Sequence, residues 1–149
     1  MPDEVRMTVL CDDGIEDHVK SGTLGIVPFD VNCLNGAGYD LRLSSKLVLA
    51  PGQQKLAATL ERIELPDDLI GTLHIRSSLA RAGIIASLAV VDPGFRGQLT
   101  ISLYNSSSEE FLMREGERFI QLVLHALSMK TRRPYRGKYQ DSQGIVERR

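Results

Sequence analysis

Short apolar or alternating runs follow one another along most of this chain, and they constrain its fold more than any other feature. Clusters of Gly, Pro, Asn and Asp separate the runs, as is typical of strands joined by turns. The runs predict strands over 24–28, 39–43, 46–49, 55–63, 69–75, 84–91, 97–104 and 119–127. Many short strands at near-even spacing indicate an all-β protein, and we expect a jelly-roll-like distorted β-barrel.

Two segments interrupt the strand pattern. Residues 12–22 begin with Asp12 and Asp13, which can cap a helix, and carry two apolar residues four positions apart. Residues 77–83 combine serines at a cap position with helix formers and a terminal glycine. We therefore expect the barrel to carry one or two short helices.

The chain of 149 residues suits a single domain with one core. Residues 1–127 hold every predicted strand, and we expect them to form that domain. Residues 128–149 contain seven Lys or Arg, few aliphatic residues and no clear period. We interpret them as a mobile C-terminal arm.

Composition excludes several classes of partner. Eighteen basic and nineteen acidic side chains leave a formal net charge of −1, so the chain lacks the basic surface of nucleic-acid-binding proteins. Two cysteines and three histidines are widely spaced, which predicts no metal ligated directly by the protein. The acidic N-terminus and the lack of a run of roughly 18 apolar residues predict a cytoplasmic protein without a signal peptide or membrane span.

The segment HIRSSLARAG, 74–83, could hold an oligophosphate. It places Arg76, Ser77, Ser78 and Arg81 around the predicted helix start. Free backbone N–H groups, hydroxyls and guanidinium groups together can bind phosphate oxygens. An ordinary helix cap with solvated arginines is the structural alternative.

Asp92 is the lone carboxylate at the tip of a predicted hairpin, in AVVDPGFRGQ. A carboxylate beside a pocket can orient and deprotonate a water molecule, although Asp-Pro-Gly is also common turn chemistry.

Gln121 is an amide within an apolar strand, where it forms hydrogen bonds either within the core or to a ligand. Arg136 and Lys138 lie between two tyrosines, a mixture suited to closing over a phosphate or to a solvated tail.

Five segments in order resemble the motifs of the trimeric dUTPase and dCTP deaminase superfamily. They are NGAGYDLRL (35–43), RSSLAR (76–81), VVDPGFRG (90–97), GERFIQL (116–122) and YRGKYQDSQG (135–144). The resemblance implies a homotrimer of jelly-roll-like subunits with active sites assembled between subunits. It implies a nucleotide-binding barrel over 1–127 and an arm, 128–149, that closes over the active site.

The resemblance is divided between the two branches of the superfamily. NGAGYDL and GERFIQL look like dUTPases, whereas the early helix, DPGF and GKYQ look like dCTP deaminases. Deaminases of this kind carry a glutamate in the strand after DPGF, where this chain has Ser102. A serine hydroxyl cannot replace a carboxylate as general base without an activating partner. We therefore expect a dUTP diphosphatase yielding dUMP and pyrophosphate, with a dCTP deaminase, monofunctional or bifunctional, and a non-catalytic nucleotide-binding trimer as alternatives.

The resemblance also implies roles for individual residues. Asp92 would orient the attacking water. Mg²⁺, bound mainly through the substrate triphosphate, would offset the negative charge of the phosphates. Asp40 would support the water shell of the metal, and Arg81 would serve in a reaction of the deaminase type. Phosphate contacts are expected from Arg76, Ser77, Ser78, Gln121, Arg136 and Lys138. Contacts to the base and sugar are expected from Ala89, Val90, Val91, Phe95 and Tyr139.

Overall fold

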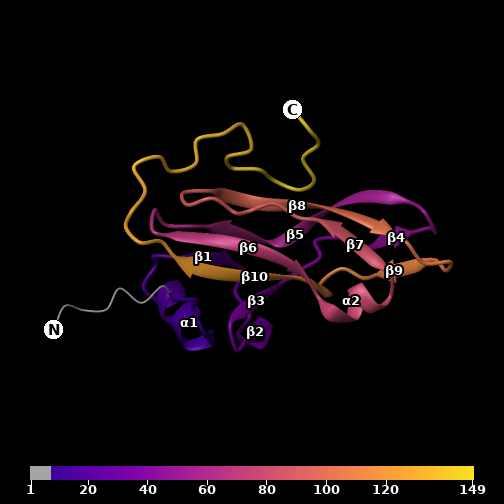
Figure 1. Cartoon of the computed structure of the whole chain (residues 1–149), viewed down its shortest axis with the longest axis horizontal. Coiled ribbons are helices and arrows are strands. Elements are labelled where there is room, and N and C mark those ends of the chain that lie inside the picture. Colours follow the sequence, from indigo (N-terminus) through magenta and orange to yellow (C-terminus); the bar gives the residue numbers. More distant parts are fainter. Residues whose placement is uncertain (1–7) are drawn as a thin grey trace.

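Two four-stranded antiparallel sheets and a two-stranded ribbon make up most of the structure, a computed structural model that describes residues 8–149 (Figure 1). The first sheet is β1 (Gly25–Val27), β5 (Gln54–Glu64), β8 (Arg96–Asn105) and β7 (Ile84–Ser87), in that order. The second is β2 (Leu34–Asn35), β3 (Gly38–Arg42), β10 (Arg118–Ala126) and β6 (Leu69–Ile75). The ribbon is β4 (Leu47–Leu49) with β9 (Phe111–Met113). Figure 1 shows the arm running along β8, outside the sheets.

The prediction of a mostly β protein with one or two short helices is confirmed, and the structure has two. Each predicted strand segment contains an observed strand, and only the very short β2 and β9 were not predicted. The run 84–91 is shorter than predicted, because β7 ends at Ser87. Val91 instead bridges Gly71 in the other sheet. The two residues are close, since a Cβ added to Gly71 would lie 3.1 Å from the Val91 side chain. The segment that follows β7 therefore leaves the first sheet and crosses to the second.

Helices α1 (Asp12–Lys20) and α2 (Ser77–Arg81) lie where the sequence predicts them, and a 3-10 turn, η1 (Val31–Cys33), precedes β2. The predicted caps are wrong by one residue in each helix. Cys11 occupies the N-cap of α1 and Arg76 that of α2. Asp12 and Asp13 lie in the first turn of α1, where negative charge interacts favourably with the helix dipole. Among the described residues, no helix is long and apolar enough to cross a membrane.

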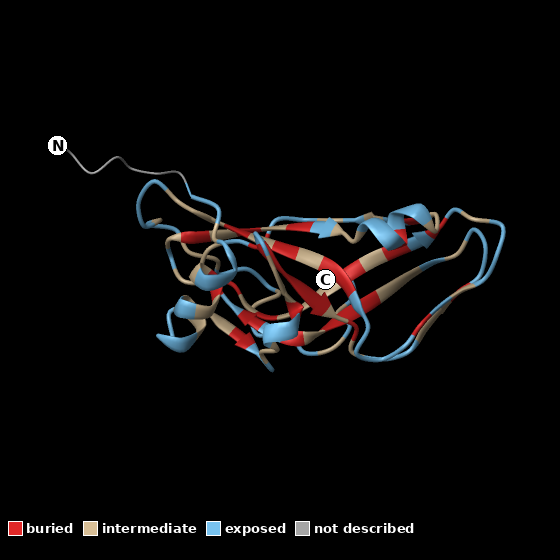
Figure 2. Ribbon diagram, turned by 90° about the horizontal axis from the view of Figure 1, so that it is seen from below, coloured by how far each residue is buried: buried red, intermediate tan, exposed pale blue. Residues whose placement is uncertain are grey.

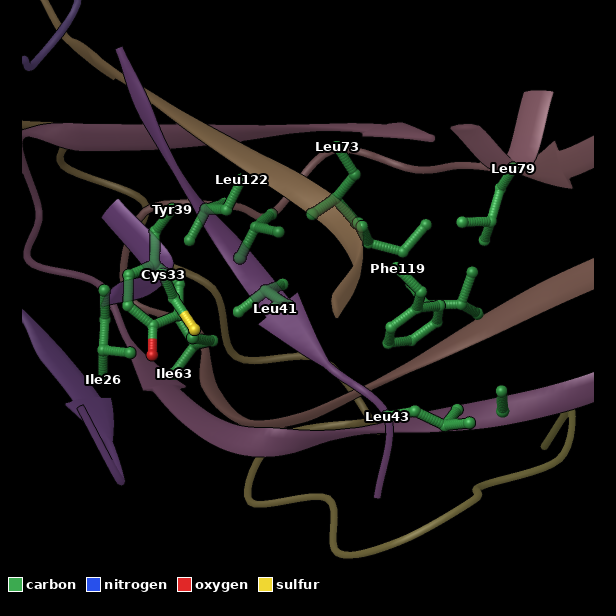
Figure 3. Packing of buried hydrophobic residues seen from close by; sticks show 14 of the residues in the cluster. Ile26, Cys33, Tyr39, Leu41, Leu43, Ile63, Leu73, Leu79, Phe119 and Leu122 are labelled. Carbon is green, nitrogen blue, oxygen red and sulfur yellow. The ribbon is translucent and has the colours of Figure 1, made fainter. Parts of the chain in front are cut away.

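The core lies between the two sheets. Tyr39 and Leu41 from β3 and Leu122 from β10 meet Ile63 from β5, and all four side chains are fully buried (Figure 3). Figure 2 shows that most buried residues lie in the strands, whereas the loop ends are largely exposed. The helices are partly exposed and bury Ile15 and Leu79. The opposite face of β10 is half-buried, and it carries Gln121, Val123 and His125.

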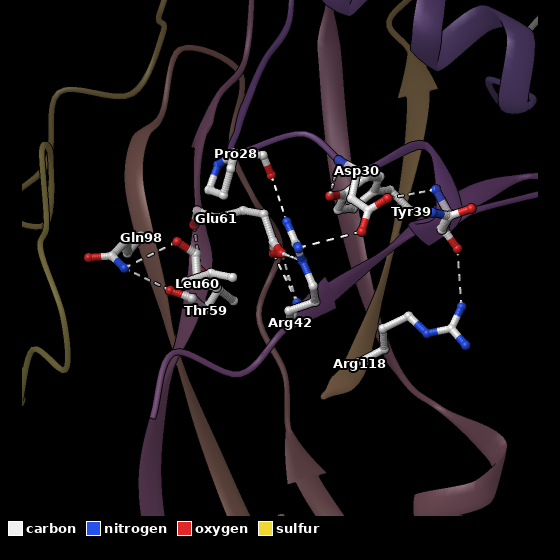
Figure 4. Close-up of polar contacts among 10 residues, drawn as sticks. Pro28, Asp30, Tyr39, Arg42, Thr59, Leu60, Glu61, Gln98 and Arg118 are labelled. Carbon is white, nitrogen blue, oxygen red and sulfur yellow. Dashed lines mark hydrogen bonds and ion pairs between the residues drawn. The ribbon is translucent and has the colours of Figure 1, made fainter. Parts of the chain in front are cut away.

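A buried ion pair joins the sheets at a bulge in β5, between Ala58 and Arg62 (Figure 4). Glu61 has no exposed surface, and its carboxylate accepts hydrogen bonds from the backbone N–H of Arg42 at 2.9 Å and from Nε at 2.8 Å. Burial raises the pKa of Glu61, and the bonds from Arg42 act against that rise. Arg42 also donates to the carbonyl of Pro28 at 2.8 Å, which fixes the chain after β1.

Arg42→Met should lower the free energy of unfolding by about 3–5 kcal/mol, because it leaves a buried carboxylate without its counter-charge. The loss should shrink as the pH falls toward 4.5, the ordinary pKa of a glutamate, since protonated Glu61 needs no partner. Urea unfolding at several pH values measures both effects. Arg114→Met, at an exposed position, is the control, and an equal loss in the two variants would contradict the importance of the ion pair.

Candidate functional site

A pocket of about 500 Å³ lies between β8, the segment after β7 and the C-terminal arm. It contains the predicted catalytic residue and all the residues predicted to contact a base or sugar: Ala89, Val90, Val91, Asp92, Phe95 and Tyr139. The remaining lining comes from β5, β8 and the arm: Leu56, Gln98, Leu99, Thr100, Tyr135, Ser142, Val146 and Arg148. The structure therefore brings one half of the predicted site together within a single chain.

Among residues 8–149, Asp92 is the only acidic residue that lines this pocket. It is exposed, and its carboxylate forms no hydrogen bond or ion pair within residues 8–149. Val91 holds the preceding backbone through two hydrogen bonds to Gly71, of 2.8 and 2.9 Å. Pro93 and Gly94 then turn the chain into β8, and Gly94 adopts a φ of +85° that suits glycine. The backbone alone therefore directs the Asp92 side chain.

Ala89 and Val90 line the pocket. They follow the end of β7, and within the described part of the chain neither forms a backbone hydrogen bond. The polar side chains on β8 are already engaged by the arm, since Gln98 accepts from the Gly144 N–H at 2.6 Å and Thr100 accepts from the Val146 N–H at 3.0 Å. The free backbone groups can therefore recognise the edge of a flat polar ring.

The arm is clamped to the first sheet by Asp141. Its carboxylate binds Arg96 through both oxygens, at 3.1 and 3.0 Å, and Arg62 at 2.9 Å. The hydrogen bonds from Arg96, with the charge of Arg62, hold the pKa of Asp141 below its ordinary value of 3.8. Neither this clamp nor the contacts of Gln98 and Thr100 were predicted, because they join segments more than 40 residues apart.

A second polar cluster lies on the other sheet, around Asp40. This nearly buried carboxylate lies 3.3 Å from Arg76 and 3.8 Å from Arg118, and it accepts a hydrogen bond from Asn35 at 3.1 Å. Gln121 donates in turn to Asn35 at 3.0 Å. The cluster joins two of the predicted phosphate ligands, Arg76 and Gln121, and keeps Arg76 partly exposed beside α2.

The other predicted phosphate ligands are spread more widely. Ser77 and Ser78 lie exposed in the first turn of α2, and Arg81 ends the helix. Arg136 lines a separate polar cavity near Gly94. Lys138 lies 5.6 Å from the centre of the Tyr139 ring and donates to the carbonyl of Arg149.

The two halves of the predicted site are separated within one chain. Val91, next to Asp92, bridges Gly71 in β6, whereas Arg76 lies five residues further along the chain, directly after the end of β6. At 3.3 Å per strand residue this spacing is about 16 Å. No residue lines both the pocket at Asp92 and the cavity at Arg76. Among the described residues, no group of three or more His, Cys, Asp or Glu side chains could hold a metal ion.

A model of the dCTP deaminase-like family matches residues 44–127, more than half of the chain. The chain belongs to this family. A dCTP deaminase from Pyrococcus furiosus is 47% identical over 132 residues, which cover 78% of this chain and 85% of the relative. A dCTP deaminase from Thermococcus sibiricus is 41% identical over 146 residues, which cover 88% of this chain and 94% of the relative.

Solved structures confirm that the fold is that of the dCTP deaminase and dUTPase superfamily. A deaminase from Agrobacterium tumefaciens has a TM-score of 0.71 at 19% identity, and the match covers 80% of this chain but only 49% of that one. The dUTPase of Staphylococcus bacteriophage 80alpha has a TM-score of 0.60 at 20% identity, with 71% and 91% of the two chains covered. The expected resemblance to the superfamily is therefore confirmed.

The prediction of a dUTP diphosphatase is wrong. The dCTP deaminases of Pyrococcus and Thermococcus are 41–47% identical over most of the chain, whereas similarity to dUTPases is more distant. The prediction depended on Ser102, which has no carboxylate. In the structure Ser102 accepts a hydrogen bond from Gln54 at 2.8 Å and does not line the pocket at Asp92. The pocket therefore has its carboxylate on the turn at Asp92 and not at position 102 on β8.

Asp141→Asn should loosen the arm, because it removes the charge that holds Arg96 and Arg62. Trypsin should then cleave after Arg136 and Lys138 faster than in the wild type, with the sites identified by mass spectrometry. Since the pKa of Asp141 is lowered, the wild-type clamp should persist in mild acid and release only as the pH falls through a value below 3.8, which the Gly144 amide signal in NMR reports. Glu147→Gln, an exposed carboxylate on the same arm, is the control, and equal cleavage of both variants would contradict the clamp.

Proposed function

We propose that this chain is a dCTP deaminase, which converts dCTP and water into dUTP and ammonia. The observation that carries the proposal is the 41–47% identity to proteins of that name over 78–88% of this chain. The pocket at Asp92 supports it, because a carboxylate, three aromatic rings and free backbone groups surround a space of about 500 Å³.

Asp92 is the proposed general base. Hydrolytic deamination forms a bond between a water oxygen and C4 of the cytosine ring and breaks the bond between C4 and the amino nitrogen. Asp92 takes one proton from the attacking water and passes it to N3 of the ring, then takes the second proton from the new hydroxyl on C4 and passes it to the amino nitrogen, so that ammonia departs and a carbonyl remains. The exposed carboxylate, which has no partner in the part of the chain that the structure describes, is free to hold that water.

The surrounding groups bind the nucleoside. The free backbone groups of Ala89 and Val90 recognise the polar edge of the pyrimidine, and Val91 fixes their position through its bridge to Gly71. The rings of Phe95 and Tyr139 cover the sugar and the base. The arm thereby closes the pocket, which excludes water other than the reacting molecule.

The phosphates bind to the second half of the site, which we infer comes from a neighbouring subunit of a homotrimer. Arg76 and Ser78 line a cavity that shares no residue with the pocket at Asp92 in the same chain. Mg²⁺ enters with the triphosphate, and Arg136 and Lys138 on the arm add positive charge. The roles of Asp40 beside the metal-bound water and of Arg81 remain predictions.

Asp92→Asn should keep the fold and the affinity for dCTP but lower turnover on the order of 10²–10⁴-fold, because the base is lost while the shape is kept. The assay follows dUTP and ammonia from Mg-dCTP, and the Kd for dCTP is measured separately. Asp17→Asn, on the exposed side of α1, is the control and should be fully active. Wild-type protein that makes no uracil nucleotide from dCTP would overturn the proposed function.

A shared site predicts complementation between inactive subunits. Arg76→Ala and Asp92→Asn should each be inactive. Mixed trimers made by co-expression of the two variants should regain about a quarter of the wild-type activity. In an equal mixture, each half of a shared site is intact in half of the cases, so both halves are intact at about a quarter of the interfaces. Arg76→Ala mixed with Ser77→Ala is the control, since both changes affect the same half. No recovery in the first mixture, or a monomeric mass in light scattering, would exclude the shared site.

A further inference from the structure

The turn that carries Asp92 is held by the C-terminal arm of the same chain. Gln140 donates from its amide nitrogen to the carbonyl of Gly94 at 2.9 Å and accepts from the N–H of Arg96 at 2.8 Å. The two backbone groups flank Phe95, so the side-chain amide pairs with them as the peptide group of a neighbouring strand does. One side chain thus fixes the end of the turn.

Other arm contacts bring Gln140 to this place. The N–H of Tyr135 donates to the carbonyl of Pro93 at 2.8 Å, and the Tyr135 and Phe95 rings meet edge to face at 5.5 Å. An added Cβ on Gly94 would lie 2.7 Å from the Cβ of Pro134, so arm and turn are in close contact. The N–H of Asp141 also donates to the carbonyl of Arg96, at 2.8 Å.

The Asp92 side chain has no partner of its own within residues 8–149, as described above. Its direction therefore depends on the backbone from Val91 to Arg96. Val91 is fixed on one side by β6, and the other side of the turn is bonded at three points by the arm, at Pro93, Gly94 and Arg96. A small shift of this turn displaces the carboxylate relative to a bound ring.

We propose that Gln140 is a positioning residue, which holds the 92–96 turn and through it directs Asp92 at the reacting carbon. Gln140 does not line the pocket at Asp92 and has no contact with the reacting atoms. The inference rests on the proposed role of Asp92. It assigns to the arm a function besides covering the pocket, because the same segment sets the geometry of the base.

Gln140→Glu tests this role. The glutamate keeps the size of the side chain and one acceptor for Arg96, but it places a carboxylate oxygen against the carbonyl of Gly94. We expect kcat for dCTP to fall about 10- to 100-fold, as for a small misplacement of a catalytic group. The KM should stay within about twofold, because the groups that bind the nucleotide are unchanged.

Gln143→Glu is the matched control, since it introduces the same charge at an exposed position of the same arm. It should leave kcat unchanged. Gln140→Met, which is neutral and of similar length, supplies the measurement if Gln140→Glu does not fold, and it should lower kcat in the same way. An unchanged kcat, a loss confined to KM or an equal loss in Gln143→Glu would each overturn the positioning role.

Hydrogen exchange separates this inference from the proposed function. The Arg96 amide should exchange slowly in the full-length wild type and much faster in Gln140→Met, whether or not the protein deaminates dCTP. Unchanged exchange would show that Gln140 does not hold the turn. Fast exchange in the variant, with no deamination by the wild type, would confirm that Gln140 holds the turn but refute the deaminase assignment together with the positioning role.

Discussion

The buried ion pair between Arg42 and Glu61 is the contact on which the arrangement of the two sheets depends. Glu61 belongs to β5 in one sheet and Arg42 to β3 in the other, and the carboxylate has no exposed surface. An isolated charge in that position would oppose folding, so the two strands must meet where the guanidinium and the backbone N–H of Arg42 can reach it. The bulge in β5 occurs at this point, which fixes the register of the longest strand pair.

A series of hydrogen bonds extends from this pair to the surface. The hydroxyl of Thr59 donates to the carbonyl of Glu61 at 2.8 Å, and the amide of Gln98 donates to the carbonyl of Thr59 at 2.8 Å (Figure 4). Gln98 also accepts from the N–H of Gly144 in the arm. The arm therefore lies on residues whose positions are set by the core. Since the arm forms one wall of the pocket at Asp92, the shape of that pocket is tied to the junction between the sheets.

The sequence predicts the strands well because alternation is a local signal, and it predicts the position of Asp92 because Asp-Pro-Gly is a local turn signal. It fails where distant segments decide. The apolar run after Ser87 continues, yet the strand stops because Val91 pairs with Gly71 on the other sheet. The part played by Gln140 depends on a turn 44 residues away, which no local pattern encodes. The branch of the superfamily likewise follows from similarity along the whole chain rather than from one position on β8.

The two halves of the proposed site use the same electrostatic device. In each, one carboxylate holds two guanidinium groups: Asp141 holds Arg96 and Arg62, and Asp40 holds Arg76 and Arg118. The two carboxylates differ in burial and in what they hold in place. Asp141 is half-exposed and fastens the arm to the first sheet. Asp40 is nearly buried and leaves the outer surface of Arg76 free for an anion. Because ion pairs within the chain already hold the guanidinium groups of each half, we expect a triphosphate to align two preformed surfaces, which lowers the entropy lost in reaching the reactive geometry.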